Sequence, residues 1–336
     1  MRKISLLFLI GWYLLANSQS VFAQSAQAVA AAKKEGGKVI LYTSMETFTA
    51  DALKAAFEKK TGLQMEYWRG GSTEVLDRVL SEHRVGKPGF DVVAITGDHM
   101  RLMANEGAIG KYQSPSMQAF AKEAIDPVLG ARYRNIMYGV IYNKNTLKAG
   151  ETPKTLEDIV KPEYRGKLVM PHPTGHTLTT QWLASLDKIL PKQRAEKFIH
   201  DLAAAKPLFA ESIVPAADKV GTGEVAIGIT FARFVLTYNK QGANLDYIRD
   251  YNMLGDGQYI NLGAKAPRPN AGKAFIDFFL DEQSMRIQAD TGEFVNRKGV
   301  YPPLQDADKI KFVQMYQFGK EDFEVKKKEY QKIFFQ

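Results

Sequence analysis

KVILYTS, residues Lys38–Ser44, combines apolar and β-branched residues with two small hydroxyl residues at its end. A short apolar run of this kind is typical of a buried strand in a parallel sheet. The helical pattern that follows keeps apolar residues on one face from Ala52 to Phe57 and ends at Gly62. This order of strand, loop and helix indicates the repeating unit of an α/β fold.

The same alternation continues along the chain. Further strands are predicted at residues 63–68, 90–95, 136–142, 168–170, 225–230 and 258–262, with helical patterns that include 271–280. A chain of 336 residues exceeds what one core usually supports, so two domains are expected. We predict a first lobe at 25–130 that returns at 258–303, a second lobe at 131–257, and C-terminal helices at 304–336.

The first residues have the pattern of a signal peptide. Arg2 and Lys3 precede the apolar run Ile4–Leu15, and a small residue, Ala23, stands at the predicted cleavage point. The apolar run is well short of the roughly 20 residues that span a bilayer, so cleavage after Ala23 is favoured over a membrane anchor. The sequence therefore predicts a secreted, periplasmic protein.

Composition excludes several classes of site. There is no cysteine, which excludes disulfides, thiol catalysis and Cys-ligated zinc. Loss of Arg2 and Lys3 with the leader lowers the net charge from +8 to +6. The basic residues are scattered, and their one run, Lys326–Lys328, lies in a helical pattern typical of a solvated face. We therefore expect no nucleic-acid partner.

Several segments resemble a known family. The chain resembles the family 1 extracellular solute-binding proteins, and more narrowly their ferric-iron-type branch, at Lys38–Ser44, Lys59–Leu63, Asp91–Val93, Tyr138–Asn143, Pro162–Leu168, Pro269–Phe278 and Gly292–Val300. The order and spacing of these segments, which cover nearly the whole mature chain, carry the resemblance.

The resemblance implies a type II periplasmic-binding-protein fold, in which two α/β lobes surround a ligand cleft and move about a hinge. It also implies a role as the substrate-binding component of an ABC transporter, which hands a small-molecule ligand to a permease in the inner membrane. We expect a monomer. The sequence has no Gly-x-Ser-x-Gly elbow, Walker loop or metal triad, so we predict no catalytic residue, no cofactor and no metal.

The family's iron ligands do not carry over. Ferric binders usually supply adjacent tyrosines after the strand that matches 225–230, and here these positions hold Arg233 and Phe234. A guanidinium cannot ligate a cation. The alternative remains a ferric-iron-binding protein, with iron held by Glu46 or tyrosines and a synergistic anion bound at Thr174–Thr177.

Ligands of α/β sheets sit beyond the carboxyl ends of the strands. The candidate ligand-binding residues are therefore those at or just after the predicted strand ends: Ser44, Met45, Arg69, Ser72, Thr96, Tyr138, Thr174, Gly175, His176, Thr177, Phe231 and Arg233. Core packing is the alternative role for the aromatic members of this set.

Two features of this set point to an anionic or strongly polar organic ligand. The turn Thr174–Thr177 opens a helix, whose N–H groups favour an anion, although Thr174 or Thr177 could simply cap that helix. Arg233 could clamp a carboxylate or phosphate, or lie on the surface. Arg69 is a weaker candidate of the same kind. Replacing Arg233 with Ala is expected to remove most of the affinity while barely changing the melting temperature of the ligand-free protein.

Overall fold

The computed structural model describes residues 26–148, 150–249 and 252–336. The chain divides into two compact units. Unit 1 comprises the residues up to Arg134, Gln258–Gln288 and Asn296–Val300, and unit 2 comprises Asn135–Gly257, Ala289–Val295 and Tyr301–Gln336. The predicted signal peptide, 1–23, lies outside the described residues.

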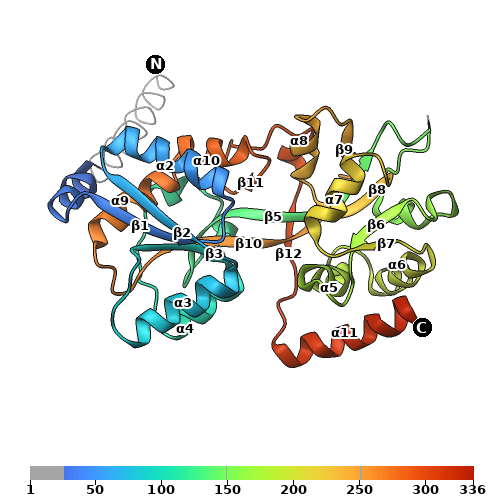
Figure 1. The fold of residues 1–336 in the computed structure, drawn as a ribbon, viewed down its shortest axis with the longest axis horizontal. Coiled ribbons are helices and arrows are strands. Elements are labelled where there is room, and N and C mark those ends of the chain that lie inside the picture. The colour runs from blue at the N-terminus through green and yellow to red at the C-terminus, as the bar shows by residue number, and fades with distance from the viewer. Residues whose placement is uncertain (1–25, 149, 250–251) are drawn as a thin grey trace, which may run out of the picture. The chain divides into compact units, whose positions relative to one another are not determined.

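Two long strands, β5 (Gly130–Asn143) and β10 (Met253–Leu262), each run from one unit into the other (Figure 1). β5 begins earlier than the predicted strand at 136–142. Arg132 and Arg134 break its apolar pattern, yet both lie within the strand. Arg134 is only 1% exposed, because its charge is paired inside the protein.

Unit 1 is built on the sheet order β2-β1-β3-β10. β1 is parallel to both β2 and β3, whereas β10 runs antiparallel to β3 and pairs Gln258 with Thr96. The other elements of this unit are β1 Lys38–Thr43, α2 Thr47–Thr61, β2 Gln64–Arg69, α3 Ser72–Arg84, β3 Val92–Thr96, α4 Gly97–Asn105, β4 Ile125–Asp126, α9 Pro269–Phe279 and α10 Glu282–Ala289. Short 3₁₀ helices span Pro115–Ala119 and Lys122–Ala124.

Helix α2 shows why the predicted boundaries in this unit are close to those of the structure. Leu53 and Phe57 are fully buried on its apolar face. The helix ends where Gly62 adopts a left-handed conformation with φ of 68°, which a glycine allows at low cost. Because β1, β2 and β3 are parallel, α2, α3 and α4 all begin at the same edge of the sheet, which we call the unit 1 edge.

Unit 2 has the sheet order β5-β8-β6-β7. β6 is parallel to β7 and β8, and β8 is antiparallel to β5, with Tyr138 opposite Phe231. The elements of this unit are β6 Leu168–Pro171, α5 Thr177–Ala184, α6 Lys192–Ala204, β7 Leu208–Ala210, α7 Ile213–Gly221, β8 Ile227–Phe231, α8 Phe234–Asn239, β9 Leu245–Tyr247, β11 Phe294–Val295, β12 Phe312–Gln314 and α11 Lys320–Phe335. Its 3₁₀ helices span Leu156–Val160, Pro162–Tyr164, Leu186–Lys188 and Ala307–Lys309.

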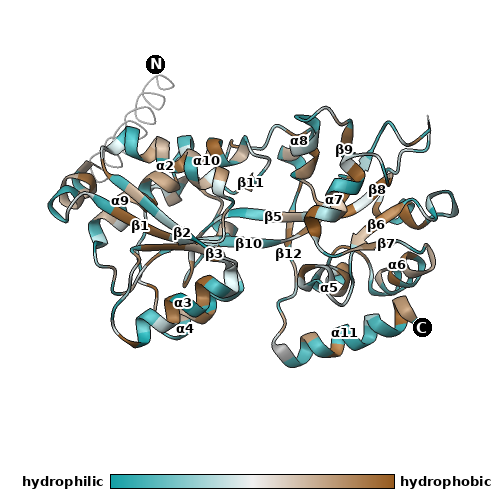
Figure 2. Ribbon diagram, in the orientation of Figure 1, coloured by the Kyte–Doolittle hydropathy of each residue, from teal (hydrophilic) through white to brown (hydrophobic). Residues whose placement is uncertain are grey.

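The C-terminal segment differs from the helices predicted at 304–336. It contains strand β12, which pairs with β10, and one long helix, α11. Figure 2 shows that α11 is mostly hydrophilic, with hydrophobic residues at its C-terminal end. Tyr330 is 1% exposed, and Ile333 and Phe334 pack against the unit 2 core. In the part of the chain that the structure describes, no helix has the length and apolar character needed to cross a membrane.

Candidate functional site

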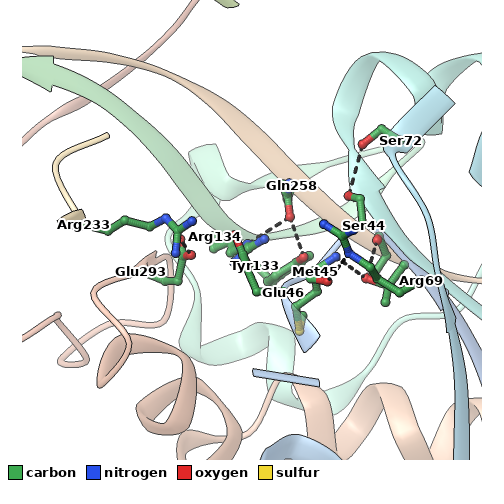
Figure 3. Close-up of polar contacts among 12 residues, drawn as sticks. Ser44, Met45, Glu46, Arg69, Ser72, Tyr133, Arg134, Arg233, Gln258 and Glu293 are labelled. Atoms are coloured by element: carbon green, nitrogen blue, oxygen red, sulfur yellow. Dashed lines mark hydrogen bonds and ion pairs between the residues drawn. The ribbon is translucent and has the colours of Figure 1, made fainter. Parts of the chain in front are cut away.

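The unit 1 edge brings together four of the predicted site residues. Strand pairing places Thr43 opposite Arg69, so the loops after β1 and β2 start side by side. Ser44 Oγ and Ser72 Oγ are 3.1 Å apart, and Arg69 Nε donates a hydrogen bond to the Met45 carbonyl oxygen at 3.3 Å (Figure 3). Two hydroxyls and a guanidinium therefore lie at the ends of adjacent strands.

Arg69 keeps its positive charge at this edge. Its side chain is exposed, and among the described residues no carboxylate forms an ion pair with it. α2 and α3 also begin here, at Thr47 and Ser72, and the positive ends of helix dipoles favour anions. This arrangement suits a phosphate or carboxylate group.

Met45 and Tyr138 do not fit the predicted role of ligand contact. The Met45 side chain is fully buried in unit 1, and the Tyr138 side chain is fully buried in unit 2. Met45 contributes only its backbone carbonyl, which holds Arg69.

The sequence did not predict a network of buried hydrogen bonds and an ion pair behind the unit 1 edge. Arg134 donates from Nε to Gln258 Oε1 at 2.9 Å and forms an ion pair with Glu46 at 3.3 Å. Tyr133 Oη donates to the same Gln258 oxygen at 2.8 Å. A charged residue in the middle of an apolar strand was the available signal, because such a residue is seldom buried unless it is paired. The pair holds Glu46, which precedes α2.

Thr96 belongs to a separate cluster at the same edge. Its hydroxyl lies 2.9 Å from His99 Nδ1, and Thr73 Oγ1 lies 3.2 Å from His99 Nε2. The Asp98 carboxylate is also bonded to His99 at 2.8 Å. Burial opposes ionisation of Asp98, but its hydrogen bonds to His99 and Thr96 outweigh that effect and lower its pKa.

In the loop before α5, histidine side chains accept hydrogen bonds from backbone N–H groups that the sequence suggested would be free for a ligand. His172 Nδ1 accepts hydrogen bonds from the N–H groups of Thr174 and Gly175, at 3.3 and 3.1 Å. The helix cap is His176, whose Nδ1 accepts from the Thr179 N–H at 3.3 Å, and not Thr174 or Thr177. Within the described chain, the N–H of the exposed Thr177 makes no hydrogen bond. The loop thus offers an anion fewer donors than we predicted.

His176 continues into a buried chain of hydroxyl groups. Thr179 Oγ1 lies 2.9 Å from His176 Nδ1 and 2.7 Å from the Tyr138 hydroxyl. Burial lowers the pKa of His176 to about 4. The imidazole is therefore neutral near pH 7, and its Nδ1 acts as an acceptor.

Arg233 is neutralised inside unit 2. Its guanidinium lies 3.7 Å from the Glu293 carboxylate, and the two side chains are 14% and 3% exposed (Figure 3). The guanidinium also lies over the Phe234 ring, 4.8 Å from its centroid. Gly292 packs so close that a Cβ there would be 3.0 Å from Arg233 Cβ. The Arg233 guanidinium thus forms an ion pair with a buried carboxylate, Glu293, and local sequence could not indicate this partner.

Phe231 packs among aromatic rings at the end of β8. It meets Tyr138 edge-on, with centroids 5.7 Å apart, and lies parallel to Phe234 at 6.0 Å. Its side chain is only partly buried, so one part of the ring remains accessible. This packing matches the core role that we kept as the alternative.

Among the residues that the structure describes, no group of three or more His, Asp or Glu side chains could hold a metal ion. Tyrosinate is the other oxygen ligand of the ferric alternative. Burial raises the pKa of Tyr42 and of Tyr142 to about 12, and it raises the pKa of Tyr138 as well.

Comparison with known proteins agrees with this architecture. Residues 52–317 match the model of the bacterial extracellular solute-binding protein family. A structure of the periplasmic binding protein AfuA from Actinobacillus pleuropneumoniae, with fructose 6-phosphate bound, is 19% identical, with a TM-score of 0.65 over 89% of this chain and 96% of that one.

Two further structures show the same fold. Iron-bound HitA from Pseudomonas aeruginosa is 18% identical, with a TM-score of 0.67 over 88% of this chain and 98% of that one. The substrate-binding protein of an ABC transporter from Agrobacterium tumefaciens is 13% identical, with a TM-score of 0.72 over 88% and 94%. The chain therefore belongs to the bacterial extracellular solute-binding proteins, a family of binding proteins and not of enzymes, and has the type II periplasmic-binding-protein fold.

Proposed function

We propose that this protein captures a small anionic organic solute in the periplasm and delivers it to an inner-membrane permease. The observation that carries the proposal is the unit 1 edge, where the cation of Arg69 lies beside the hydroxyls of Ser44 and Ser72 at the start of two helices. Hydroxyl and N–H donors around one guanidinium complement the oxygens of a phosphate or carboxylate.

The energies support an anion over its neutral analogue. A charge-assisted hydrogen bond contributes about 1.5–3 kcal/mol, and each exposed helix N-terminus adds about 0.3–1 kcal/mol. The edge therefore favours an anionic group by about thirtyfold to several thousandfold. A phosphorylated sugar is the first ligand to try, because AfuA, which shares the fold, binds fructose 6-phosphate.

Ferric iron is the less favoured cargo. HitA binds iron with the same fold, but the Glu46 carboxylate is already paired with Arg134. Addition of ferric citrate tests this directly, since tyrosinate bound to iron would give a charge-transfer colour.

The test of the proposal begins with native mass spectrometry of protein taken from a periplasmic extract, before and after mild denaturation. The mass of the intact chain also reports cleavage after Ala23. Calorimetry then compares fructose 6-phosphate with fructose. We expect binding of the phosphorylated sugar alone, or of a co-purifying anion in its place.

Arg69→Ala should weaken binding of that anion by tenfold or more, because it removes the charged donor. Arg84→Ala is the matched control, since Arg84 is an exposed arginine at the far end of α3. Equal affinity in wild type and Arg69→Ala would refute the anion site. A co-purifying neutral molecule would refute the ligand class.

A further inference from the structure

Unit 1 contains a cavity of about 500 Å³ that is distinct from the unit 1 edge. The residues that line it are 111–115, 117–118, 125–128 and 130, with Asn261 from β10. Ser44, Arg69 and Ser72 are not among these residues. Pockets for small molecules commonly measure 300–1,000 Å³, so this cavity could hold a compact organic molecule.

Asn261 provides an acceptor inside the cavity. Its side chain is 5% exposed, and its Nδ2 donates to the Leu129 carbonyl oxygen at 2.7 Å. This bond fixes the amide orientation, because a flipped amide would place two acceptors together. In the described part of the chain, no donor reaches Asn261 Oδ1.

The direction of this oxygen follows from its neighbours. A Cβ on Gly130 would lie 3.8 Å from Asn261 Oδ1 and 3.5 Å from the terminal methyl of Met117. Gly130, Met117 and Asn261 all line the cavity. The oxygen is thus a deeply placed acceptor that faces the space beside Met117. A ligand N–H or O–H that reached this oxygen would form a hydrogen bond in a largely enclosed place.

The walls carry little net charge. Their apolar part is made by Tyr112, Pro115, Met117, Ile125, Pro127 and Val128, and Gln113, Ser114 and Gln118 add uncharged polar groups. Tyr112 is held in place because its hydroxyl donates to Asp277, at 2.9 and 3.0 Å. The lining carries one cation and one anion, Lys111 and Asp126, and Asp126 is already bonded to Arg101.

We propose that this cavity binds a small uncharged molecule with a compact apolar body and one N–H or O–H donor, such as a primary amide or an alcohol. The donor bonds to Asn261 Oδ1, and the body packs against Met117 and Val128. This site is independent of the anion site at the unit 1 edge, so either proposal can fail alone.

The experiment uses methyl-labelled methionine in the full mature protein, observed by NMR. The Met117 methyl is assigned with Met117→Leu and reports on the cavity, while the fully buried Met65 reports on folding. Benzamide is the probe, and N,N-dimethylbenzamide is its analogue without a donor. We expect benzamide to shift Met117 with a Kd on the order of 1 mM, and the dimethyl analogue to bind about tenfold more weakly.

Two tryptophan variants locate the binding. Val128→Trp fills the cavity, whereas Leu102→Trp adds the same side chain at a position of similar exposure, 50% against 46%, outside the lining. Benzamide should shift Met117 in Leu102→Trp but not in Val128→Trp. No shift in wild type, or equal binding to both variants, would overturn the site. Equal affinity for the two probes would overturn the assigned ligand class.

Discussion

Arg233 and Glu293 show how one ion pair changes the expectation for a residue. Glu293 is 3% exposed, so loss of Arg233 would remove a positive partner from a buried carboxylate. Breaking a buried pair in this way costs about 3–5 kcal/mol. This geometry argues against the expectation that Arg233→Ala barely affects the ligand-free protein. That expectation and the contact of Arg233 with ligand both stay predictions.

We now expect Arg233→Ala to lower the free energy of unfolding by about 3 kcal/mol in urea titrations without ligand. The double variant Arg233→Ala with Glu293→Gln should recover much of this loss, because the amide does not need a counter-charge. If the double variant is no more stable than Arg233→Ala, charge neutralisation is not the role of Arg233.

His176 makes the stability depend on pH. Its pKa is about 4 in the folded protein, against 6.5 ordinarily, so the unfolded chain binds the proton first as the pH falls. This contribution is fully present above about pH 6.5, is lost between pH 6.5 and 4, and levels off below pH 4. The loss from pH 7.5 to pH 5 is about 2 kcal/mol.

The measurement compares urea unfolding of the wild type and His176→Asn at both pH values. Asn keeps a capping acceptor for the Thr179 N–H but does not titrate. The wild type should therefore lose about 2 kcal/mol more than the variant over this range. Parallel losses in the two proteins would show that His176 is not the titrating group.

At the scale of elements, helix caps decided where the candidate donors point. α3 begins after Gly71, and the Glu74 carboxylate accepts from the Gly71 N–H at 2.8 Å. Ser72 is therefore the first helical residue, and its hydroxyl is left to meet Ser44. At α5, the cap is a residue other than the expected one. His176 caps this helix, and the Thr174–Thr177 loop is left with fewer free donors.

Helix α11 is predicted to be part of the unit 2 core and not an appendage. Tyr330 is 1% exposed, so Tyr330→Ala should lower the free energy of unfolding by about 3 kcal/mol. Val325 lies on the same helix but is 62% exposed, and Val325→Ala should change it by less than about 0.5 kcal/mol. Similar urea midpoints for the two variants would contradict this role of α11.

For the whole molecule, we expect ligand binding to change the average conformation, because folds of this class close around their ligands by hinge motion. Small-angle scattering should show a smaller radius of gyration with saturating ligand than without it. Arg69→Ala at the same ligand concentration is the control, since it should stay closer to the ligand-free value. An unchanged radius in the wild type would argue against closure.

The sequence alone determined the longer strands β1, β2, β3, β5, β6, β8 and β10, because hydrophobic periodicity and glycine punctuation are local properties, but it did not indicate the short strands β7 and β12. The run Lys38–Ser44 and the stop at Gly62 appear in the structure at nearly the predicted residues. The candidate loops followed from the same pattern, since parallel strands place their carboxyl ends at one edge.

Only the tertiary structure decided which of the candidate side chains keep their charge or their donors. Arg233 meets Glu293, and Arg134 meets Glu46, through contacts between residues far apart in the chain. Arg69 remains exposed at the edge, whereas Met45 turns into the core. Burial and ion pairing depend on which segments pack together, and a local pattern of residues carries no information about a distant partner.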